Sequence, residues 1–343
     1  MTQHRQALES TAREMVAQGK GILAADESNK TMTKRLEAVD VESTQDTRLR
    51  FRELLVTTPG AAEHISGVIL YDETIRQTSD GTPFPTLLEG LGMIPGIKVD
   101  TGAKPLAGAD GETITEGLDG LRERLAEYHE LGARFAKWRA VITIGEGLPS
   151  RYCISANAHA LARYAALCQE AAIVPIVEPE VLMDGEHSID RSEEVTTATL
   201  RAVFAELLDQ RVLLEGMVLK PNMVLSGYDS TDKAGVEEVA RRTVALLRRV
   251  VPAAVPGIAF LSGGQSDELA TAHLNAMNAL GTAPWQLSFS YGRALQASPL
   301  KAWGGQESNV EATQAAFAHR ARCNGEARYA RYTKELEHEP AAA

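Results

Sequence analysis

The 343-residue sequence predicts a single-domain α/β protein built as a closed (β/α)8 barrel, also called a TIM barrel. Three observations lead to this prediction: eight short apolar runs have strand character, helical patterns separate them, and no linker divides the chain. The runs start 29 to 45 residues apart, close to or above the ~30 residues of a strand–helix–strand unit. We expect the barrel to occupy residues 1–334 and a flexible C-terminal tail to occupy residues 335–343.

The expected strands are short and almost wholly apolar, which is typical of parallel strands that are buried on both faces. They are Ile22–Ala25, Gly67–Tyr71, Ile97–Val99, Phe135–Val141, Ile173–Val177, Met217–Leu219, Ile258–Leu261 and Leu287–Phe289. An open, doubly wound sheet is the structural alternative. The Gly-x-Gly-x-x-Gly turn that would support it is absent at the first run.

Helices are expected between the strands, where apolar residues recur at helical spacing. The clearest apolar face consists of Leu200, Val203, Phe204, Leu207 and Leu208. Residues 161–168 and 236–247 show the same periodicity. Ser192 and Ser266 each precede two acidic residues, which predicts two helix starts. A serine hydroxyl caps free N–H groups, and acids favour the positive end of the helix dipole.

Composition and charge exclude several functional classes. Apolar residues make up 44% of the chain, and no run approaches the 18 apolar residues of a membrane span. Charged residues are scattered through residues 1–20, so we expect no signal peptide. The net charge of −11 disfavours general binding to nucleic acid or anionic membranes. An anionic ligand would therefore need a local basic pocket.

Cysteine and histidine usage argues against a metal mechanism. The three cysteines, Cys153, Cys168 and Cys323, are far apart and form no Cys-x-x-Cys pair. The eight histidines are scattered without metal-ligand spacing. We therefore expect a reducing, cytoplasmic environment and no metal site.

Polar side chains follow seven of the eight expected strands. In chain order they are Asp26-Glu27-Ser28, Lys98 with Asp100, Lys137 with Arg139, Glu178 with Glu180, Lys220, Ser262-Gly263-Gly264 and Ser290-Tyr291-Gly292-Arg293. A single lysine at a strand end is usually a surface residue, and a glycine-rich turn is often only a turn. Together, however, these residues would converge on one mouth of the barrel. Because burying charge is costly unless the charge is used, we interpret the set as an active site.

The residue types at these strand ends indicate a reaction class. Three lysines and two arginines predict a strongly cationic pocket, and neighbouring cations lower the pKa of a lysine. A neutral amine can form a Schiff base with a carbonyl, and the carboxylates of Asp26, Glu178 and Glu180 can move protons. The last two strand ends offer hydroxyl, glycine N–H and arginine donors that suit a phosphate. The residues predict a metal-free enzyme acting on a phosphorylated carbonyl compound, and they leave open which lysine is the nucleophile.

Longer motifs carry a family resemblance that covers the chain from about Arg5 to Tyr332. They include Gly21-Ile-Leu-Ala-Ala-Asp-Glu-Ser28, Phe135-Ala-Lys-Trp-Arg139, Ile176-Val-Glu-Pro-Glu180, Leu219-Lys-Pro-Asn-Met-Val224, Phe260-Leu-Ser-Gly-Gly-Gln-Ser266 and Phe289-Ser-Tyr-Gly-Arg-Ala-Leu-Gln-Ala297. In these motifs and their order the sequence resembles class I fructose-1,6-bisphosphate aldolase, the Schiff-base type. The resemblance implies a (β/α)8 barrel that cleaves fructose 1,6-bisphosphate reversibly to dihydroxyacetone phosphate and glyceraldehyde 3-phosphate, with no cofactor and no metal.

The resemblance also implies roles for individual residues. Lys220 would form the Schiff base, Glu178 would be the main general acid/base, and Glu180 would support it. Asp26 would assist proton transfer, while Lys137 would hold substrate and help to keep Lys220 unprotonated. The phosphate on the ketone half would meet Ser262, Gly263, Gly264, Ser290, Gly292 and Arg293. The other phosphate and the sugar hydroxyls would meet Ser28, Thr31, Arg35, Lys98 and Arg139.

The resemblance further implies a cytoplasmic homotetramer of glycolysis and gluconeogenesis. The sequence departs from many relatives at Asn29, Lys30 and Thr31, and it lacks the C-terminal tyrosine of animal relatives. Two alternatives remain open: a transaldolase-like or deoxyribose-phosphate aldolase-like enzyme, and a barrel kept only as a binding scaffold. Two separate phosphate sites argue against the first. The intact set of Lys220, Glu178 and Asp26 argues against the second.

Overall fold

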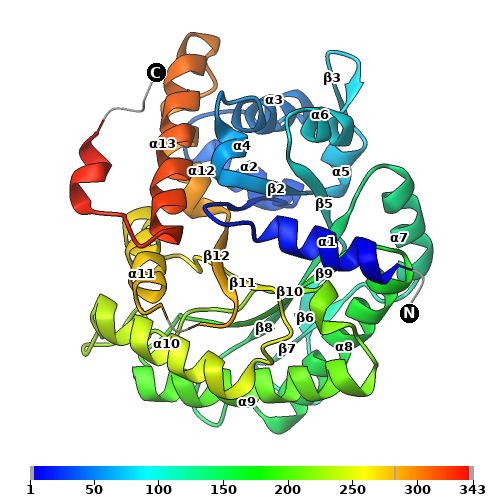
Figure 1. Ribbon diagram of the computed structural model, residues 1–343, viewed down its shortest axis with the longest axis vertical. Coiled ribbons are helices and arrows are strands. Elements are labelled where there is room, and N and C mark those ends of the chain that lie inside the picture. Colours follow the sequence, from blue (N-terminus) through cyan, green and yellow to red (C-terminus); the bar gives the residue numbers. More distant parts are fainter. Residues whose placement is uncertain (1–3, 282, 340–343) are drawn as a thin grey trace.

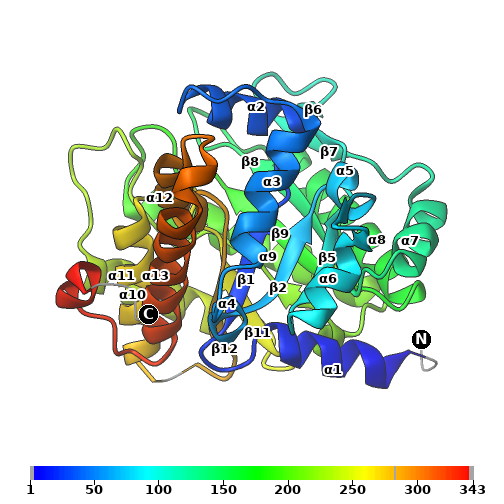
Figure 2. The ribbon, with the colours of Figure 1, turned by 90° about the horizontal axis from the view of Figure 1, so that it is seen from above.

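A computed structural model describes residues 4–281 and 283–339. Eight parallel strands close into a barrel in the order β1-β12-β11-β10-β9-β8-β5-β2 (Figures 1 and 2). They are β1 (Gly21–Ala25), β2 (Ile65–Leu70), β5 (Ile94–Lys98), β8 (Phe135–Ile142), β9 (Val174–Val181), β10 (Val218–Leu219), β11 (Gly257–Phe260) and β12 (Gln286–Tyr291). The predicted fold class is confirmed, and each expected strand overlaps one strand of the barrel.

Helices surround the barrel. They are α1 (Arg5–Met15), α2 (Asn29–Glu37), α3 (Gln45–Val56), α4 (Ala61–His64), α5 (Asp72–Ile75), α6 (Phe84–Gly90), α7 (Leu121–Glu130), α8 (Arg151–Glu170), α9 (Ile189–Asp209), α10 (Val236–Val250), α11 (Asp267–Ala279), α12 (Arg293–Trp303) and α13 (Val310–Arg328). Short 3-10 helices are η1 (Leu214–Gly216), η2 (Glu307–Asn309) and η3 (Lys334–His338). Two small hairpins, which the sequence did not predict, are β3 (Thr78–Ser79) with β4 (Thr82–Pro83) and β6 (Gly102–Pro105) with β7 (Thr113–Glu116).

The two predicted helix starts have different outcomes. Ser266 caps α11, since its hydroxyl accepts a hydrogen bond from the N–H of Leu269 at 3.2 Å. The predicted start at Ser192 is wrong, because α9 begins one turn earlier behind Ser188, which caps the N–H of Arg191. Acidic residues follow both Ser188 and Ser192, but capping at Ser188 lets α9 begin one turn earlier. Ser192 is consequently buried inside α9.

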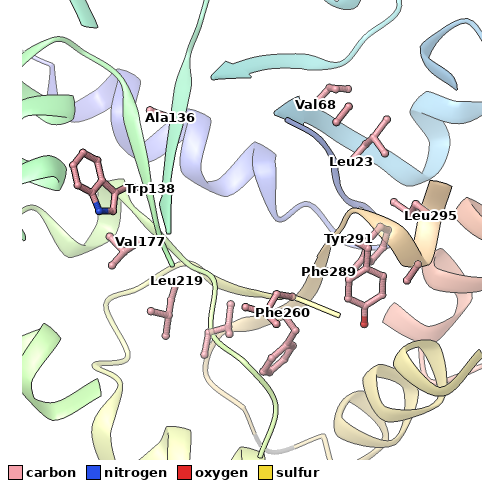
Figure 3. Close-up of a cluster of buried hydrophobic side chains, with 14 of the residues drawn as sticks. Leu23, Val68, Ala136, Trp138, Val177, Leu219, Phe260, Phe289, Tyr291 and Leu295 are labelled. Carbon is pink, nitrogen blue, oxygen red and sulfur yellow. The ribbon is translucent and has the colours of Figure 1, made fainter. Parts of the chain in front are cut away.

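The outward faces of the strands pack against the surrounding helices. Figure 3 shows part of this layer: Leu23, Val68, Ala136, Trp138, Val177, Leu219, Phe260, Phe289, Tyr291 and Leu295. The ring of Trp138 stacks on Tyr164 of α8 with 5.5 Å between ring centroids. Burying apolar surface in this layer supplies the main driving force for closing the barrel.

A second, smaller core fills the lower interior of the barrel. Ile22, Ile69, Phe135 and Ile176 come from different strands and meet there. Leu8, Ala12 and Met15 of α1 belong to the same cluster, so α1 closes this end of the barrel. In Figure 2, α1 lies at the bottom of the molecule and α2 at the top. The interior is therefore a packed core at one end and is free to be polar at the other.

On β8 and β9 the inward face of the strand changes from apolar to charged along its length. Side chains alternate between the two faces of a strand, so residues two apart point the same way. On β9, the apolar interior residue Ile176 is followed by Glu178 and Glu180. On β8, Phe135 is followed in the same way by Lys137 and Arg139. The regular period of the strands is therefore sufficient to place charged groups at the upper mouth.

The C-terminal segment lies against α13 rather than extending freely as far as it is described. Lys334–His338 form η3, and Leu336 is buried. Flexibility of residues 335–343 stays a prediction, and residues 340–343 lie outside the described part of the chain. Within the described residues, no helix combines the length and the apolar character needed to cross a membrane.

Candidate active site

All sixteen site residues predicted from the sequence line one cavity of about 530 Å³ at the upper mouth of the barrel. The structure thus brings together residues that are up to 267 positions apart, from Asp26 to Arg293. The remaining lining residues are Ala24, Glu27, Asp100, Gly102, Ala103, Val141, Leu182, Asp184, Tyr228 and Leu261. The cavity is formed by strand ends and the loops that follow them, where barrel enzymes carry out their chemistry.

Strand register aligns the charged rows of β8 and β9. Arg139 is paired with Glu178, and Val141 with Glu180. The next strand along the barrel, β10, ends directly before Lys220, whose backbone N–H donates to the carbonyl of Val177 at 2.8 Å. Parallel pairing therefore sets the heights of the lysine and the two glutamates relative to each other.

Lys137 is the centre of a buried ion cluster. Its Nζ lies 2.6 Å from Asp26 Oδ2, 3.7 Å from Glu178 Oε2 and 3.9 Å from Asp100 Oδ2. Burial acts to lower the pKa of Lys137, but Asp26, Glu178 and Asp100 together raise it above its ordinary value. Lys137 is therefore held as a charged ammonium group.

The same cluster sets the state of Asp26. Burial acts to raise the pKa of this carboxyl, but the ammonium groups of Lys137 and Lys220 outweigh burial and hold the pKa well below its usual range. Asp26 is thus a carboxylate throughout the physiological range. It can accept and return a proton only when the charges around it change.

Lys220 has fewer partners than Lys137. Its Nζ lies 3.2 Å from Glu178 Oε1, and Glu178 is the one carboxylate within 4 Å of it among the described residues. Lys98, the third lysine, pairs with Asp100 at 3.3 Å and lies over the ring of Tyr71, 5.8 Å from its centroid. Lys220 and Lys137 share Glu178, so one carboxylate contacts both amines.

The prediction of a strongly cationic pocket is wrong. Six cationic and six acidic side chains line the cavity, so its charges balance. The acids were underestimated because Glu27 and Asp100, although named at the strand ends, were not counted among the site carboxylates, and Asp184 was not named at all. The expected lowering of lysine pKa by crowded cations does not hold for Lys137, because its nearest neighbours are carboxylates.

Glu180 differs from Asp26 in its proton affinity. Burial raises the pKa of Glu180, and the guanidinium of Arg139, which donates from Nε to Glu180 Oε2, only partly offsets this. Arg139 itself is 43% exposed at the side chain and faces the open part of the cavity. A carboxyl with a raised pKa is suited to proton donation.

One corner of the mouth is rich in donors for an anion. The turn between β11 and α11 contains Gly263 and Gly264, which have φ of +58° and +101° and therefore need glycine. The loop after β12 ends at Gly292, directly before Arg293 opens α12. The buried hydroxyl of Ser290 has no hydrogen-bond partner within residues 4–281 and 283–339. This corner offers backbone, hydroxyl and guanidinium donors to one ligand group.

A second corner is built on the start of α2. Ser28 caps this helix by accepting a hydrogen bond from the N–H of Thr31, and its Oγ lies 3.2 Å from Thr31 Oγ1. Arg35, one turn further along α2, pairs with Glu27 Oε1. The amide of Gln296 on α12 donates to the same Glu27 oxygen at 2.7 Å. Glu27 therefore connects the two corners of the mouth.

Buried arginines hold this second corner in place. Arg52, fully buried, donates to the backbone carbonyl of Glu27 at 2.9 Å. Arg48 binds Glu73 through two hydrogen bonds of 2.8 and 2.6 Å, and Asn29 donates to Glu73 at 3.1 Å. Sequence reasoning missed these supporting residues, because nothing in a pattern of apolar runs shows which distant arginine reaches which loop.

Fold and site together define a class of protein: a (β/α)8-barrel enzyme with a lysine–carboxylate centre at the mouth of the barrel. Comparison with known proteins identifies the family within that class. The sequence model of the family "Fructose-bisphosphate aldolase class-I" matches residues 7–343.

Individual relatives agree with this match. A "probable fructose-bisphosphate aldolase class 1" of Xanthomonas campestris is 59% identical over 320 residues, which cover 93% of this chain and 96% of the relative. Cytosolic fructose-bisphosphate aldolase 6 of Arabidopsis thaliana is 57% identical over 92% of this chain and 88% of its own length. The solved fructose-bisphosphate aldolase from Plasmodium falciparum superposes with a TM-score of 0.96 at 48% identity and 97% coverage of both chains.

The chain belongs to the class I fructose-bisphosphate aldolase family. Its activity is the reversible aldol cleavage of fructose 1,6-bisphosphate, which proceeds through a Schiff base and needs no metal. The enzyme is a lyase of glycolysis. The family match excludes the transaldolase-like, deoxyribose-phosphate aldolase-like and scaffold alternatives.

Proposed function

We propose that Lys220 is the lysine that forms the Schiff base. The observation that carries this assignment is the difference between the two buried amines at the mouth. Lys137 contacts three carboxylates and is held as an ammonium group, whereas Lys220 contacts only Glu178 among the described residues. A Schiff base needs a neutral amine, and the amine with a single carboxylate beside it can transfer its proton to that carboxylate.

Glu178 then acts as the general acid and base of the reaction. Its Oε1 lies 3.2 Å from the Lys220 amine, within reach of the proton that the amine must lose. The neutral amine attacks the ketone carbon, and the protonated Glu178 supplies the proton with which the carbinolamine oxygen leaves as water. The resulting carboxylate takes the proton of the substrate 4-hydroxyl as the C3–C4 bond breaks and the iminium receives the electron pair. Glyceraldehyde 3-phosphate is the product of this half-reaction.

The second half-reaction regenerates the amine. The enamine on Lys220 is protonated at C3, and water hydrolyses the iminium to release dihydroxyacetone phosphate. Glu180, whose pKa is raised, assists these proton transfers next to Glu178. Asp26 assists from beside Lys137, whose Nζ lies 2.6 Å from Asp26 Oδ2.

The two donor-rich corners are suited to the two phosphates of the substrate. Ser262, Gly263, Gly264, Ser290, Gly292 and Arg293 would hold the phosphate on the ketone half. Ser28, Thr31, Arg35, Lys98 and Arg139 would hold the other phosphate and the sugar hydroxyls. The support for this division is that the two sets come from different arcs of the barrel: the loops after β11 and β12 on one side of β1, and α2, which follows β1, with β5 and β8 beyond β2 on the other side.

Reductive trapping tests the assignment of Lys220. Borohydride added with dihydroxyacetone phosphate should produce a stable adduct whose mass maps to Lys220. Lys98→Ala is the matched control, because it removes a lysine of the same cavity and should leave this adduct in place. Lys220→Ala should give no adduct. Mapping of the adduct to Lys137 or Lys98 in the unaltered enzyme would show that the assignment is wrong.

We infer that the enzyme works as a cytoplasmic homotetramer and serves gluconeogenesis as well as glycolysis. Support comes from the cytosolic designation of the Arabidopsis relative and from the reversibility of the reaction. Sedimentation analysis at micromolar concentration should give the mass of four 37.0 kDa chains. A monomeric or dimeric mass would contradict the tetramer without affecting the assignment of Lys220.

A further inference from the structure

Tyr228 lies in the wall of the cavity but has no part in the mechanism described above. It belongs to the loop between Lys220 and α10, it is half-buried, and its side chain lines the cavity. Its hydroxyl donates a hydrogen bond to the backbone carbonyl of Gly263 at 3.1 Å. One side chain from the loop after β10 thus holds the backbone of the turn after β11.

Two neighbouring loops, after β9 and after β11, keep this tyrosine in place. The N–H of Tyr228 donates to the carbonyl of Met183 at 2.9 Å, and the N–H of Asp229 donates to that of Gly185 at 2.9 Å. The buried side chain of Met183 lies between the tyrosine and the turn: its Sδ is 3.5 Å from the Tyr228 hydroxyl. A Cβ at Gly263 would come within 1.8 Å of the Met183 methyl group. The tyrosine is therefore anchored at both its backbone and its hydroxyl.

The bond to Gly263 constrains the most easily rotated peptide of the turn. A peptide between two glycines has no Cβ on either side to oppose a flip. A flip would turn the Gly263 carbonyl oxygen, which carries partial negative charge, to the opposite side. In the described structure this oxygen is held by Tyr228, and neither Gly263 nor Gly264 has its N–H bonded to another described residue.

Arg293 places this turn at the anion-binding corner. A Cβ added at Gly264 would lie 3.0 Å from Arg293 Nη2 and 3.6 Å from the Tyr228 hydroxyl. The tyrosine hydroxyl and the guanidinium therefore approach the same glycine. Burial raises the pKa of Tyr228 to about 12, so its hydroxyl keeps its proton and remains a donor at neutral pH.

We propose that Tyr228 is a positioning residue for the phosphate on the ketone half of the substrate. It holds the Gly263 carbonyl away from that phosphate and keeps the Ser262–Gly264 turn in the one orientation that presents its N–H groups. This inference rests on the proposed placement of the ketone-half phosphate at Arg293. It predicts an effect on binding of that half of the substrate and little effect on the bond-breaking step.

Tyr228→Phe tests the proposal, since it removes only the hydroxyl. Losing one hydrogen bond of this kind should raise the Kd for dihydroxyacetone phosphate, and the KM for fructose 1,6-bisphosphate, by about threefold to tenfold. The kcat should stay within about a factor of two, as should the Kd for glyceraldehyde 3-phosphate, which binds at the other corner. A structural defect alone would not produce this split between the two products.

Two further variants make the result decisive. Tyr164→Phe is the matched control, because Tyr164 also donates to a backbone carbonyl at 3.1 Å, that of Ile176, but it lies outside the cavity. It should leave the Kd for dihydroxyacetone phosphate unchanged. Equal weakening in both tyrosine variants, or a fall in kcat alone, would overturn the role of Tyr228.

Arg293→Ala separates this proposal from the one it rests on. It should weaken dihydroxyacetone phosphate binding more than Tyr228→Phe does. If Arg293→Ala weakens binding and Tyr228→Phe does not, only the role of Tyr228 is wrong. If neither variant weakens binding, the placement of the ketone-half phosphate is wrong.

Discussion

Two clusters of buried charged side chains in this protein contain similar groups but differ in their purpose. The first is the mouth cluster of Lys137, Lys220, Asp26, Asp100 and Glu178. The second, which we call the C-terminal clasp, consists of His319, Arg320, Tyr332 and Glu337 and fastens η3 to α13. In both clusters cationic groups contact carboxylates that are largely shielded from water.

The clusters differ in how their central carboxylate is satisfied, although Arg320 Nε of the clasp also has no hydrogen-bond partner among the described residues. Both oxygens of Glu337 in the clasp have donors, since Tyr332 donates to Oε1 at 2.6 Å and Arg320 to Oε2. In the mouth, Glu178 Oε2 has no hydrogen-bond donor among the described residues. Buried polar groups normally find partners, so an unsatisfied carboxylate beside a lysine indicates a function rather than a contribution to stability.

Replacing one cationic residue in each cluster with methionine should give the largest difference between the clusters, seen in kcat/KM and in the free energy of unfolding. Lys220→Met should lower kcat/KM by about 10³-fold or more, because the proposed nucleophile is lost. Its free energy of unfolding should change by no more than about 1 kcal/mol, since Glu178 keeps its contact with Lys137. Steady-state kinetics and urea unfolding measure the two quantities.

Arg320→Met should give the reverse pattern. It removes the main partner of Glu337 and the donor to Thr271 at 2.8 Å, and should lower the free energy of unfolding by about 3 kcal/mol. Activity of the folded fraction should be unchanged. Equal loss of activity in both variants would show that the clasp belongs to the catalytic machinery and would remove the contrast.

A second test of the comparison removes the charge of one glutamate near each cluster, Glu180 at the mouth and Glu337 in the clasp. Burial raises the pKa of Glu180, so the folded state binds its proton more tightly than the unfolded state does, and ionisation costs stability above about pH 4.3. For Glu337, burial acts to raise the pKa, but hydrogen bonds from Arg320 and Tyr332 outweigh it and lower the pKa. Its contribution to stability is present above that pH and is lost as the pH falls through the folded-state pKa.

Replacing glutamate by glutamine should therefore change the free energy of unfolding in opposite directions at the two positions. At pH 7, Glu337→Gln should lower the free energy of unfolding by about 1 kcal/mol, and Glu180→Gln should raise it by a smaller amount. The difference for Glu180→Gln should shrink below about pH 4, where its carboxyl is protonated in both states, and the difference for Glu337→Gln should shrink as the pH falls through the lowered folded-state pKa of Glu337. Urea unfolding at pH 7 and pH 3.5 measures this. The same sign for both variants at pH 7 would contradict the comparison.

The mouth could be predicted from the sequence because strand period and strand ends are local properties. Lys137 and Glu178 are each two or four residues from an apolar inward position, so their placement follows from alternation alone. The pairing of Lys137 with Asp26, 111 residues earlier, depends on how the barrel closes and is not visible in any local pattern. The sequence therefore predicts which charged groups reach the mouth but not which of them pair.

The clasp and the supports of α2 could not be predicted for the same reason. Glu337 looked like part of a charged tail, and its two donors lie on another helix and on the loop after it. Arg48 and Arg52 occupy a helix whose pattern indicates only that it packs on the barrel. Side chains that act through long-range contacts carry no periodic signal.

The smallest expected difference concerns two peripheral residues, Asn29 at the start of α2, which supports the mouth, and His319 in the clasp. Asn29 follows the helix cap Ser28 and donates to Glu73 at 3.1 Å, while His319 lies 3.4 Å from Glu337 Oε2. Asn29→Ala removes a donor from a carboxylate that keeps both bonds to Arg48, so the stability loss should be only about 0.5 kcal/mol.

Asn29→Ala should nevertheless change substrate binding. With the bond to Glu73 gone, the start of α2 is held less firmly, and Ser28 and Thr31 must be ordered when the substrate binds. The KM for fructose 1,6-bisphosphate should rise about twofold to threefold at unchanged kcat. His319→Ala should leave both constants unchanged, because no part of the clasp lines the cavity. An unchanged KM in Asn29→Ala would mean that the cap at Ser28 alone orders this corner, and that the contact with Glu73 serves the fold in the same way as the clasp does.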